Sequence, residues 1–263
     1  HGLCYEWCKR AHIPFNPPSE NSNEFWKDSA PDSLMDAIDM VGQKFDAVIV
    51  DEGQDFYPNW WVPLEMINKE GEEGAMYVFF DPEQNLYIDQ ANSLPALGEP
   101  FRLPVNCRNT KLIAEHCSGI INNPVPTPEG APKGVEPEVT LLALEVDIKK
   151  KVERYVHEWI NKGKLKPKQV AILSPNRQIN SSLKREIKIK GVPLTNEIQD
   201  WKDNKAILFS TIKKFKGLEA DAIILIDVPE EESFNLKQSD YYVACSRAKH
   251  LLAIIKKTIN YEL

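Results

Sequence analysis

Three acidic side chains follow a short apolar run near the start of the chain. Residues 47–50 read Ala-Val-Ile-Val, and Asp51, Glu52 and Asp55 come within the next five positions. Carboxylate oxygens are preferred magnesium ligands, and a neighbouring acid can orient an attacking water. The same residues also fit a polar strand end that caps a turn, or the site of a metal-dependent nuclease. This segment taken alone leaves all three interpretations open.

Four later segments also place polar side chains beside apolar runs, at 81–87, 106–110, 211–219 and 242–249. An arginine there can stabilise the charge that develops in phosphoryl transfer, an aromatic side chain can stack on a base, and lysines can hold phosphates. Each residue alone also fits an ordinary surface or packing role. The candidates in these segments are Gln84, Tyr87, Arg108, Thr211, Lys213, Lys214, Lys216, Gly217, Glu219 and Arg247.

The elements that must position these residues alternate between two patterns. Apolar runs of strand length recur, and their lack of polar alternation predicts parallel strands that are buried on both faces. Helical patterns lie between them at 149–163 and at 182–191, the second with Gly191 at its end. This alternation predicts an α/β fold with a mostly parallel sheet, whose ligands sit at the carboxyl ends of the strands. The predicted strands are 47–50, 75–81, 139–144, 170–174, 207–211, 222–228 and 251–255.

Composition narrows the class of protein. The 263 residues carry a net charge of −7, which argues against binding nucleic acid by bulk attraction alone but leaves room for a local basic groove. No apolar run approaches the roughly 18 residues of a membrane span, and the first residues do not resemble a signal peptide. The five cysteines are odd in number and scattered, which favours a reducing cytoplasm. The missing initiator Met predicts a fragment or a processed product.

In this order the segments resemble the motifs of UvrD/Rep-like superfamily 1 DNA helicases. The stretch Asp-Glu-Gly-Gln-Asp at 51–55 resembles the Walker B motif, and the later four segments resemble motifs III, IV, V and VI. The resemblance implies two RecA-like P-loop NTPase lobes, the first of them incomplete. A boundary near residues 100–105 predicts a partial first lobe at 1–105 and a second lobe at 106–263.

The resemblance also implies roles around a nucleotide. Asp51 would hold Mg²⁺, Glu52 would act as the catalytic base, and Gln84 would sense the γ-phosphate of ATP. Arg108 and Arg247 would act as arginine fingers that stabilise the transferring phosphoryl group. The cofactors implied are therefore ATP and Mg²⁺.

A second set of implied contacts concerns the glycine turn of motif V and the nucleic acid. Gly217 would permit a tight backbone turn from which Glu219 approaches the nucleotide. Cys107 stands where the family usually has a Tyr that packs on the adenine, and Lys213 replaces a usual His, which keeps a phosphate contact but changes its geometry. The residues implied to contact single-stranded DNA are Tyr87, Thr211, Lys213, Lys214 and Lys216.

One expected element is missing from the sequence, because no Gly-x-x-x-x-Gly-Lys-Ser/Thr loop occurs in it. Without backbone N–H groups to cradle the phosphates, we expect the chain by itself not to hydrolyse ATP appreciably, and we expect a parent helicase with a further domain upstream of His1. The alternatives are a non-catalytic, nucleotide-dependent DNA-binding or regulatory module, a nuclease that uses Asp51, Glu52 and Asp55, and a scaffold without activity.

Overall fold

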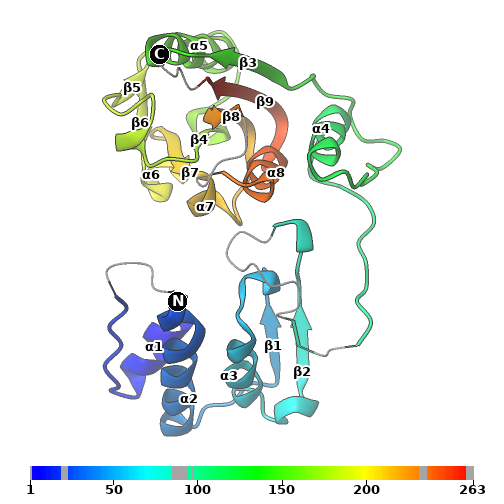
Figure 1. Ribbon diagram of the computed structural model, residues 1–263, viewed down its shortest axis with the longest axis vertical. Coiled ribbons are helices and arrows are strands. Elements are labelled where there is room, and N and C mark those ends of the chain that lie inside the picture. Colours follow the sequence, from blue (N-terminus) through cyan, green and yellow to red (C-terminus); the bar gives the residue numbers. More distant parts are fainter. Residues whose placement is uncertain (1, 19–22, 85–93, 96–97, 231–235, 259–263) are drawn as a thin grey trace, which may run out of the picture. The chain divides into compact units, whose positions relative to one another are not determined.

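Figure 1 shows the computed structural model of the chain, which describes residues 2–18, 23–84, 94–95, 98–230 and 236–258. The chain divides into two compact units, His1–Phe101 and Arg102–Leu263. Each unit combines helices with parallel strands, so the predicted α/β class is confirmed. None of the helices in the described ranges is long and apolar enough to cross a membrane.

The first unit contains a two-stranded parallel sheet. Ala47 pairs with Ala75 and Val50 pairs with Val78, so the two strands run side by side over their whole length. Parallel neighbours require a crossover connection, and this one includes a short helix. The helices and strands of this unit are α1 (Gly2–Arg10), α2 (Ala30–Val41), β1 (Ala47–Val50), α3 (Trp61–Met66) and β2 (Ala75–Val78).

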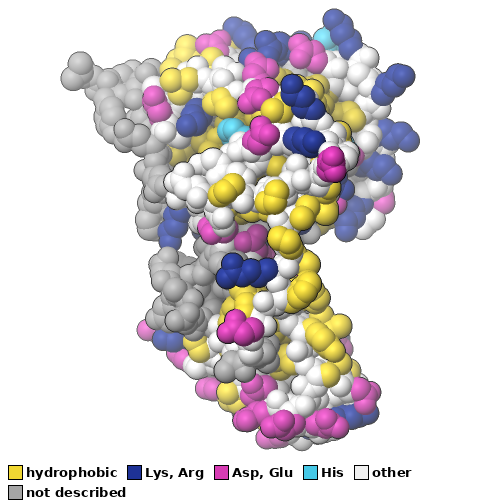
Figure 2. All heavy atoms as spheres, turned by 90° about the vertical axis from the view of Figure 1, so that its right-hand side faces the viewer, with side chains coloured by type: hydrophobic (Ala, Val, Ile, Leu, Met, Phe, Trp, Pro, Cys, Tyr) yellow, Lys and Arg dark blue, Asp and Glu magenta, His cyan; other side chains and the backbone are white. Residues whose placement is uncertain are grey.

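Among the described residues of this unit, only one face of the small sheet is packed. Val48 and Val50 of β1 belong to the core that the sheet forms with α1, α2 and α3. On the opposite face Ile49 is 70% exposed and Tyr77 is 59% exposed. The prediction that these two strands are buried on both faces is therefore wrong, because their side chains alternate between a packed and an open face. Figure 2 also shows hydrophobic side chains at the surface of this unit.

The second unit is built on a seven-stranded sheet with the order β3-β9-β8-β4-β7-β6-β5. Every neighbouring pair is parallel except β5 with β6, so the predicted mostly parallel sheet is confirmed. The strands are β3 (Glu138–Leu142), β4 (Val170–Ser174), β5 (Lys188–Ile189), β6 (Val192–Thr195), β7 (Ile207–Thr211), β8 (Ala220–Pro229) and β9 (Ala248–Lys257). The α-helices are α4 (Lys111–Ile121), α5 (Glu145–Val156), α6 (Ile198–Lys202), α7 (Ile212–Phe215) and α8 (Gln238–Ser246).

The centre of this sheet forms the core of the second unit. All five residues of β4 are buried, and its neighbours β7 and β8 are buried along nearly their whole length. Helix α5 packs on the sheet through Ile148, Val152 and Tyr155. At the carboxyl ends of the central strands, Ser174 of β4 is in register with Thr211 of β7. The segments that follow these two strands therefore begin side by side.

The segment 182–191 does not form the predicted helix. Its second half belongs to an antiparallel hairpin, in which Ile189 pairs with Val192 across the turn residues Lys190 and Gly191. Lys190 has a φ of 48° and Gly191 a φ of 83°. Positive φ at both central positions defines the type I′ turn that joins adjacent antiparallel strands. Gly191 thus closes a hairpin, and the helix prediction is wrong because this turn and the burial of Ile189 override the helical pattern.

Candidate functional site

The acidic segment lies at the carboxyl end of β1. Asp51 is exposed there, and its Oδ1 accepts a hydrogen bond from the Glu52 N–H at 2.9 Å. Glu52 has a φ of 56°, a left-handed conformation that is uncommon for a residue with a side chain and that clusters at functional sites. A Cβ on Gly53 would lie 2.4 Å from Val78 Cγ1, so glycine is required where the chain passes β2. The chain therefore turns sharply after β1, with both acids at the turn.

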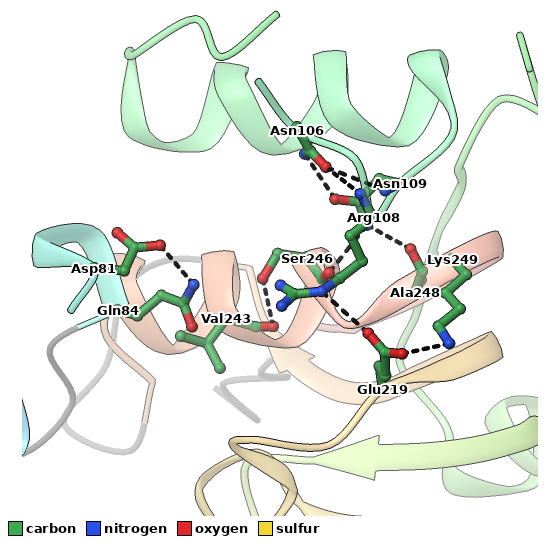
Figure 3. Close-up of polar contacts among 10 residues, drawn as sticks. All are labelled: Asp81, Gln84, Asn106, Arg108, Asn109, Glu219, Val243, Ser246, Ala248 and Lys249. Atoms are coloured by element: carbon green, nitrogen blue, oxygen red, sulfur yellow. Dashed lines mark hydrogen bonds and ion pairs between the residues drawn. The ribbon is translucent and has the colours of Figure 1, made fainter. Parts of the chain in front are cut away.

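A series of hydrogen bonds connects Glu52 to Gln84. Gln54 Nε2 donates to Glu52 Oε2 at 2.6 Å, and Gln54 Oε1 accepts the Asp81 N–H at 3.0 Å. Gln84 Nε2 then donates to Asp81 Oδ2 at 2.6 Å (Figure 3). The predicted base and the predicted nucleotide sensor are thus linked through Gln54 and Asp81. Tyr87, the predicted base-stacking residue, lies outside the described residues.

Asn109 joins the turn before α4 to the backbone around Arg247. Asn109 Nδ2 donates to the carbonyl oxygens of Ser246 at 3.0 Å and Ala248 at 2.6 Å (Figure 3). Asn106 Oδ1 accepts the backbone N–H of Arg108 at 3.0 Å and that of Asn109 at 3.2 Å. Asn109 is buried, and sequence reasoning missed it. The signal was its place in the turn that opens α4, directly after the predicted arginine finger.

Arg108, Glu219 and Lys249 form a charged cluster in the second unit. Arg108 Nε lies 3.3 Å from Glu219 Oε2, and Lys249 Nζ contacts the other oxygen of the same carboxylate (Figure 3). The Lys249 ammonium, and after it the Arg108 guanidinium, hold the pKa of Glu219 below its usual value. Two residues predicted to act on the nucleotide are therefore brought together, and Lys249 is a further member that the sequence did not single out.

Arg247 directly follows helix α8, which packs against α4. The residue is buried, with 3% of its surface exposed. Its neighbour Ser246 is also buried and donates from Oγ to the Val243 carbonyl at 3.0 Å, within the last turn of the helix. The predicted second arginine finger is therefore part of a tightly packed helix end.

The residues of the predicted motif V form a short turn after β7. Thr211 caps α7, because its Oγ1 accepts the Lys214 N–H at 3.2 Å. Lys214 Nζ donates to the Asn196 carbonyl at 3.1 Å, and both Lys213 and Lys214 are exposed. Gly217 has a φ of 80°, the left-handed conformation that glycine adopts without a steric penalty. The turn thus presents Thr211 and Lys213 at the carboxyl edge of the sheet.

A hollow of about 230 Å³ opens beside this turn. The residues that line it are Pro175, Arg177, Thr211, Ile212, Lys213 and Asp240. Arg177 reaches it because the segment after β4 begins next to Thr211 in the sheet. Sequence reasoning did not include Arg177, although its place three residues after a buried strand was a signal that could have found it.

Within the described ranges, no group of three or more His, Cys, Asp or Glu side chains is arranged to hold a metal ion. A magnesium ion that accompanies ATP needs fewer protein ligands, because waters and phosphate oxygens complete its octahedron. The exposed carboxylate of Asp51 at the end of β1 fits that requirement.

Part of the second unit matches a known family. Residues 206–255 match the family model described as the UvrD-like helicase C-terminal domain. The matched segment runs from β7 to β9 and contains the motif V turn and Arg247. The predicted resemblance to UvrD-like helicases is confirmed over these residues. The sequence has no match among curated proteins.

Several solved structures are similar to the chain. The C-terminal domain of a possible DNA helicase from Lactobacillus plantarum WCFS1 is 20% identical with a TM-score of 0.42, over 57% of this chain and 86% of that one. An arterivirus nonstructural protein 10, a helicase, is 13% identical with a TM-score of 0.39, over 97% of this chain and 57% of that one. The same helicase in complex with DNA is 15% identical with a TM-score of 0.40, over 81% of this chain and 40% of that one. These likenesses are weak and assign neither activity nor partner to this chain.

Proposed function

We propose that this chain is part of an ATP-dependent helicase or translocase that moves along single-stranded DNA. The observation that carries the proposal is the meeting of three distant segments in the second unit. Arg108 lies 3.3 Å from Glu219, and Asn109 holds the carbonyl groups on both sides of Arg247. The family match over residues 206–255 supports it, because two of the three segments lie within it.

In this proposal ATP, bound with Mg²⁺, supplies the phosphoryl group whose transfer drives movement. Asp51 would hold the magnesium ion, and Glu52 would orient the attacking water. Gln84 would report the state of the nucleotide to Glu52, through the hydrogen bonds described above. Arg108 and Arg247 would stabilise the charge that develops in the transition state, a role in which an arginine can contribute several orders of magnitude in rate.

The proposed strand-binding surface is the carboxyl edge of the second sheet. Thr211 supplies a hydroxyl and Lys213 and Arg177 supply positive charge around the hollow. Such contacts hold phosphates and position a strand without reading its sequence. Three further residues stay candidates for the same strand on the resemblance alone: Lys214, Lys216 and Tyr87.

Fluorescence anisotropy with a labelled oligo(dT) strand tests this surface. Lys213→Gln should weaken binding and lower the slope of log affinity against log salt by about 1, because one phosphate contact is lost. Lys162→Gln, at an exposed lysine far along the chain from this turn, is the matched control and should leave the slope unchanged. An unchanged slope for Lys213→Gln would contradict the proposed surface.

A nucleotide-dependent binding module without turnover is the second candidate for the chain by itself. The observation that favours it is the lack of a Gly-Lys-Ser/Thr loop in the sequence. We expect phosphate release by the pure chain to stay at background with and without DNA, while Arg108→Gln weakens binding of a fluorescent ATP analogue. Robust DNA-stimulated turnover by the chain would exclude this second candidate.

A further inference from the structure

Asp240 lines the hollow beside Thr211, and its two carboxylate oxygens differ in their surroundings. Oδ2 accepts the Lys237 N–H at 3.0 Å at the start of α8. Oδ1 is buried and has no hydrogen-bond partner among the described residues, and only 4% of the residue is exposed. Because an unpaired buried carboxylate oxygen is destabilising, a donor supplied by a bound molecule would relieve the cost.

The other polar side chains of the hollow carry positive charge or a hydroxyl group. Arg177 and Lys213 are exposed cations, and Thr211 adds a hydroxyl. A phosphate fits these three groups but offers no donor to a carboxylate at neutral pH. A metal cation is disfavoured there, because it would be repelled by the two basic side chains. The hollow therefore combines a basic part that suits a phosphate with one acceptor that suits a neutral hydrogen-bond donor.

The wall that carries Arg177 is held in place by a buried acid. Asp227 Oδ2 accepts the Ser182 N–H at 2.9 Å and the Ser174 hydroxyl at 3.4 Å, and Asp227 Oδ1 accepts the Ser182 hydroxyl. These bonds fix the chain on both sides of Arg177. Between them, the Asn180 N–H donates to the Arg177 carbonyl at 2.8 Å. The hollow is thus part of the folded framework of the second unit.

We propose that Asp240 Oδ1 accepts a hydrogen bond from the nucleotide whose phosphate lies against Arg177 and Lys213. The inference rests on the proposed function, because it requires a nucleic-acid strand in the hollow. Such a nucleotide offers two kinds of neutral donor, the ribose 2′-hydroxyl and the N–H groups of the base, whereas deoxyribose within a strand offers none. Asp240 thereby determines which strands bind best, as a specificity residue beside the non-specific phosphate contacts.

Anisotropy titrations with four strands of equal length distinguish the two donors. They are oligo(rU), oligo(dU), 2′-fluoro oligo(U), and an abasic deoxyribose strand that has neither donor. If the ribose hydroxyl is the donor, the wild type binds oligo(rU) on the order of tenfold more tightly than oligo(dU) and 2′-fluoro oligo(U). If the base is the donor, the wild type binds those three similarly and the abasic strand more weakly.

Asp240→Asn tests which residue causes the preference. The asparagine oxygen can still accept the Lys237 N–H, while the other oxygen is replaced by an amide that cannot accept. We expect the variant to bind the abasic strand as the wild type does and to lose the preference among the four strands. Asp147→Asn, at a partly exposed acid on α5, is the matched control and should keep the preference.

Each further outcome decides the inference. An Asp240→Asn variant that folds and keeps the wild-type preference overturns it, and so does a wild type that binds all four strands equally. A wild type that binds none of them overturns the proposed function as well. If Asp240→Asn fails to fold, the wild-type series still decides, together with Arg177→Gln at an exposed position. That variant should bind all four strands more weakly by the same factor and keep the preference among them.

Discussion

Asn109 Nδ2 donates a hydrogen bond to the Ser246 carbonyl at 3.0 Å, although the two residues are 137 positions apart in the sequence. The same amide group donates to the Ala248 carbonyl at 2.6 Å, so Arg247 stands between two anchored carbonyl groups. Asn106 Nδ2 donates to Asn109 Oδ1 at 2.8 Å, which fixes the orientation of the amide. The turn before α4 and the end of α8 are therefore one hydrogen-bonded assembly.

Asn109→Asp should destabilise the second unit by about 3 kcal/mol. The substitution removes the donors of both hydrogen bonds and sets a carboxylate against two buried carbonyl groups, and a buried group that loses its partner costs roughly 1–3 kcal/mol. Urea unfolding measures the change as a lower midpoint. Asn123→Asp makes the same chemical change at an exposed position, and we expect its effect to stay within about 0.5 kcal/mol. Equal midpoints for the two variants would refute the anchoring role.

The cluster around Glu219 should respond to acid. Its two cationic neighbours hold the pKa of Glu219 below the usual 4.5, so the carboxylate stabilises the fold above that pH and loses its contribution as the pH falls through the lowered value. The difference in thermal midpoint between the wild type and Glu219→Gln should therefore be constant near neutral pH and shrink as the pH falls below 4.5. Lys249→Gln should reduce this pH dependence, because its ammonium is the main cause. A difference that grows on acidification would contradict this assignment.

Two glycine substitutions should change the stability of the protein in opposite directions. Gly191→Ala places a side chain at a φ of 83° and should cost about 1 kcal/mol, although no heavy atom lies within 4 Å of the new Cβ. Gly119→Ala lies within α4, also with nothing within 4 Å, and should stabilise the protein by about 0.5–1 kcal/mol because alanine favours a helix. Thermal unfolding of both variants gives the comparison. If Gly191→Ala leaves the thermal midpoint unchanged, the prediction that an alanine is strained in this turn is wrong.

Asp227→Ala should loosen the segment that carries Arg177. Asp227 is buried with a φ of 56°, and its loss leaves donors of Ser174 and Ser182 without their acceptor. We expect a stability loss of about 3 kcal/mol and faster hydrogen exchange at the Ser182 amide. Asp203→Ala, at an exposed acid, is the control. Unchanged exchange at Ser182 in a folded Asp227→Ala variant would rule out the anchoring role of Asp227.

The sequence by itself determined the buried strands of the second unit. Strands β4 and β7 span the residues that were predicted, because apolar runs of this length are stable mainly where a sheet is covered on both faces. The turn at Gly217 could also be predicted, since a positive φ is a local property of the residue. The candidate residues of the site were identified in the same way, from short patterns next to strands, and their roles toward ATP and DNA stay predictions.

Tertiary structure alone decided which of these residues meet. No local pattern distinguishes the open face at Ile49 and Tyr77 from a packed one, because the sequence of a strand does not specify what lies beside it. The contact of Asn109 with Ser246 and the shared hollow of Arg177 and Asp240 depend on the strand order and on the packing of α4 against α8. That order is set by the whole sheet, since its chain crossovers bring distant segments to one edge.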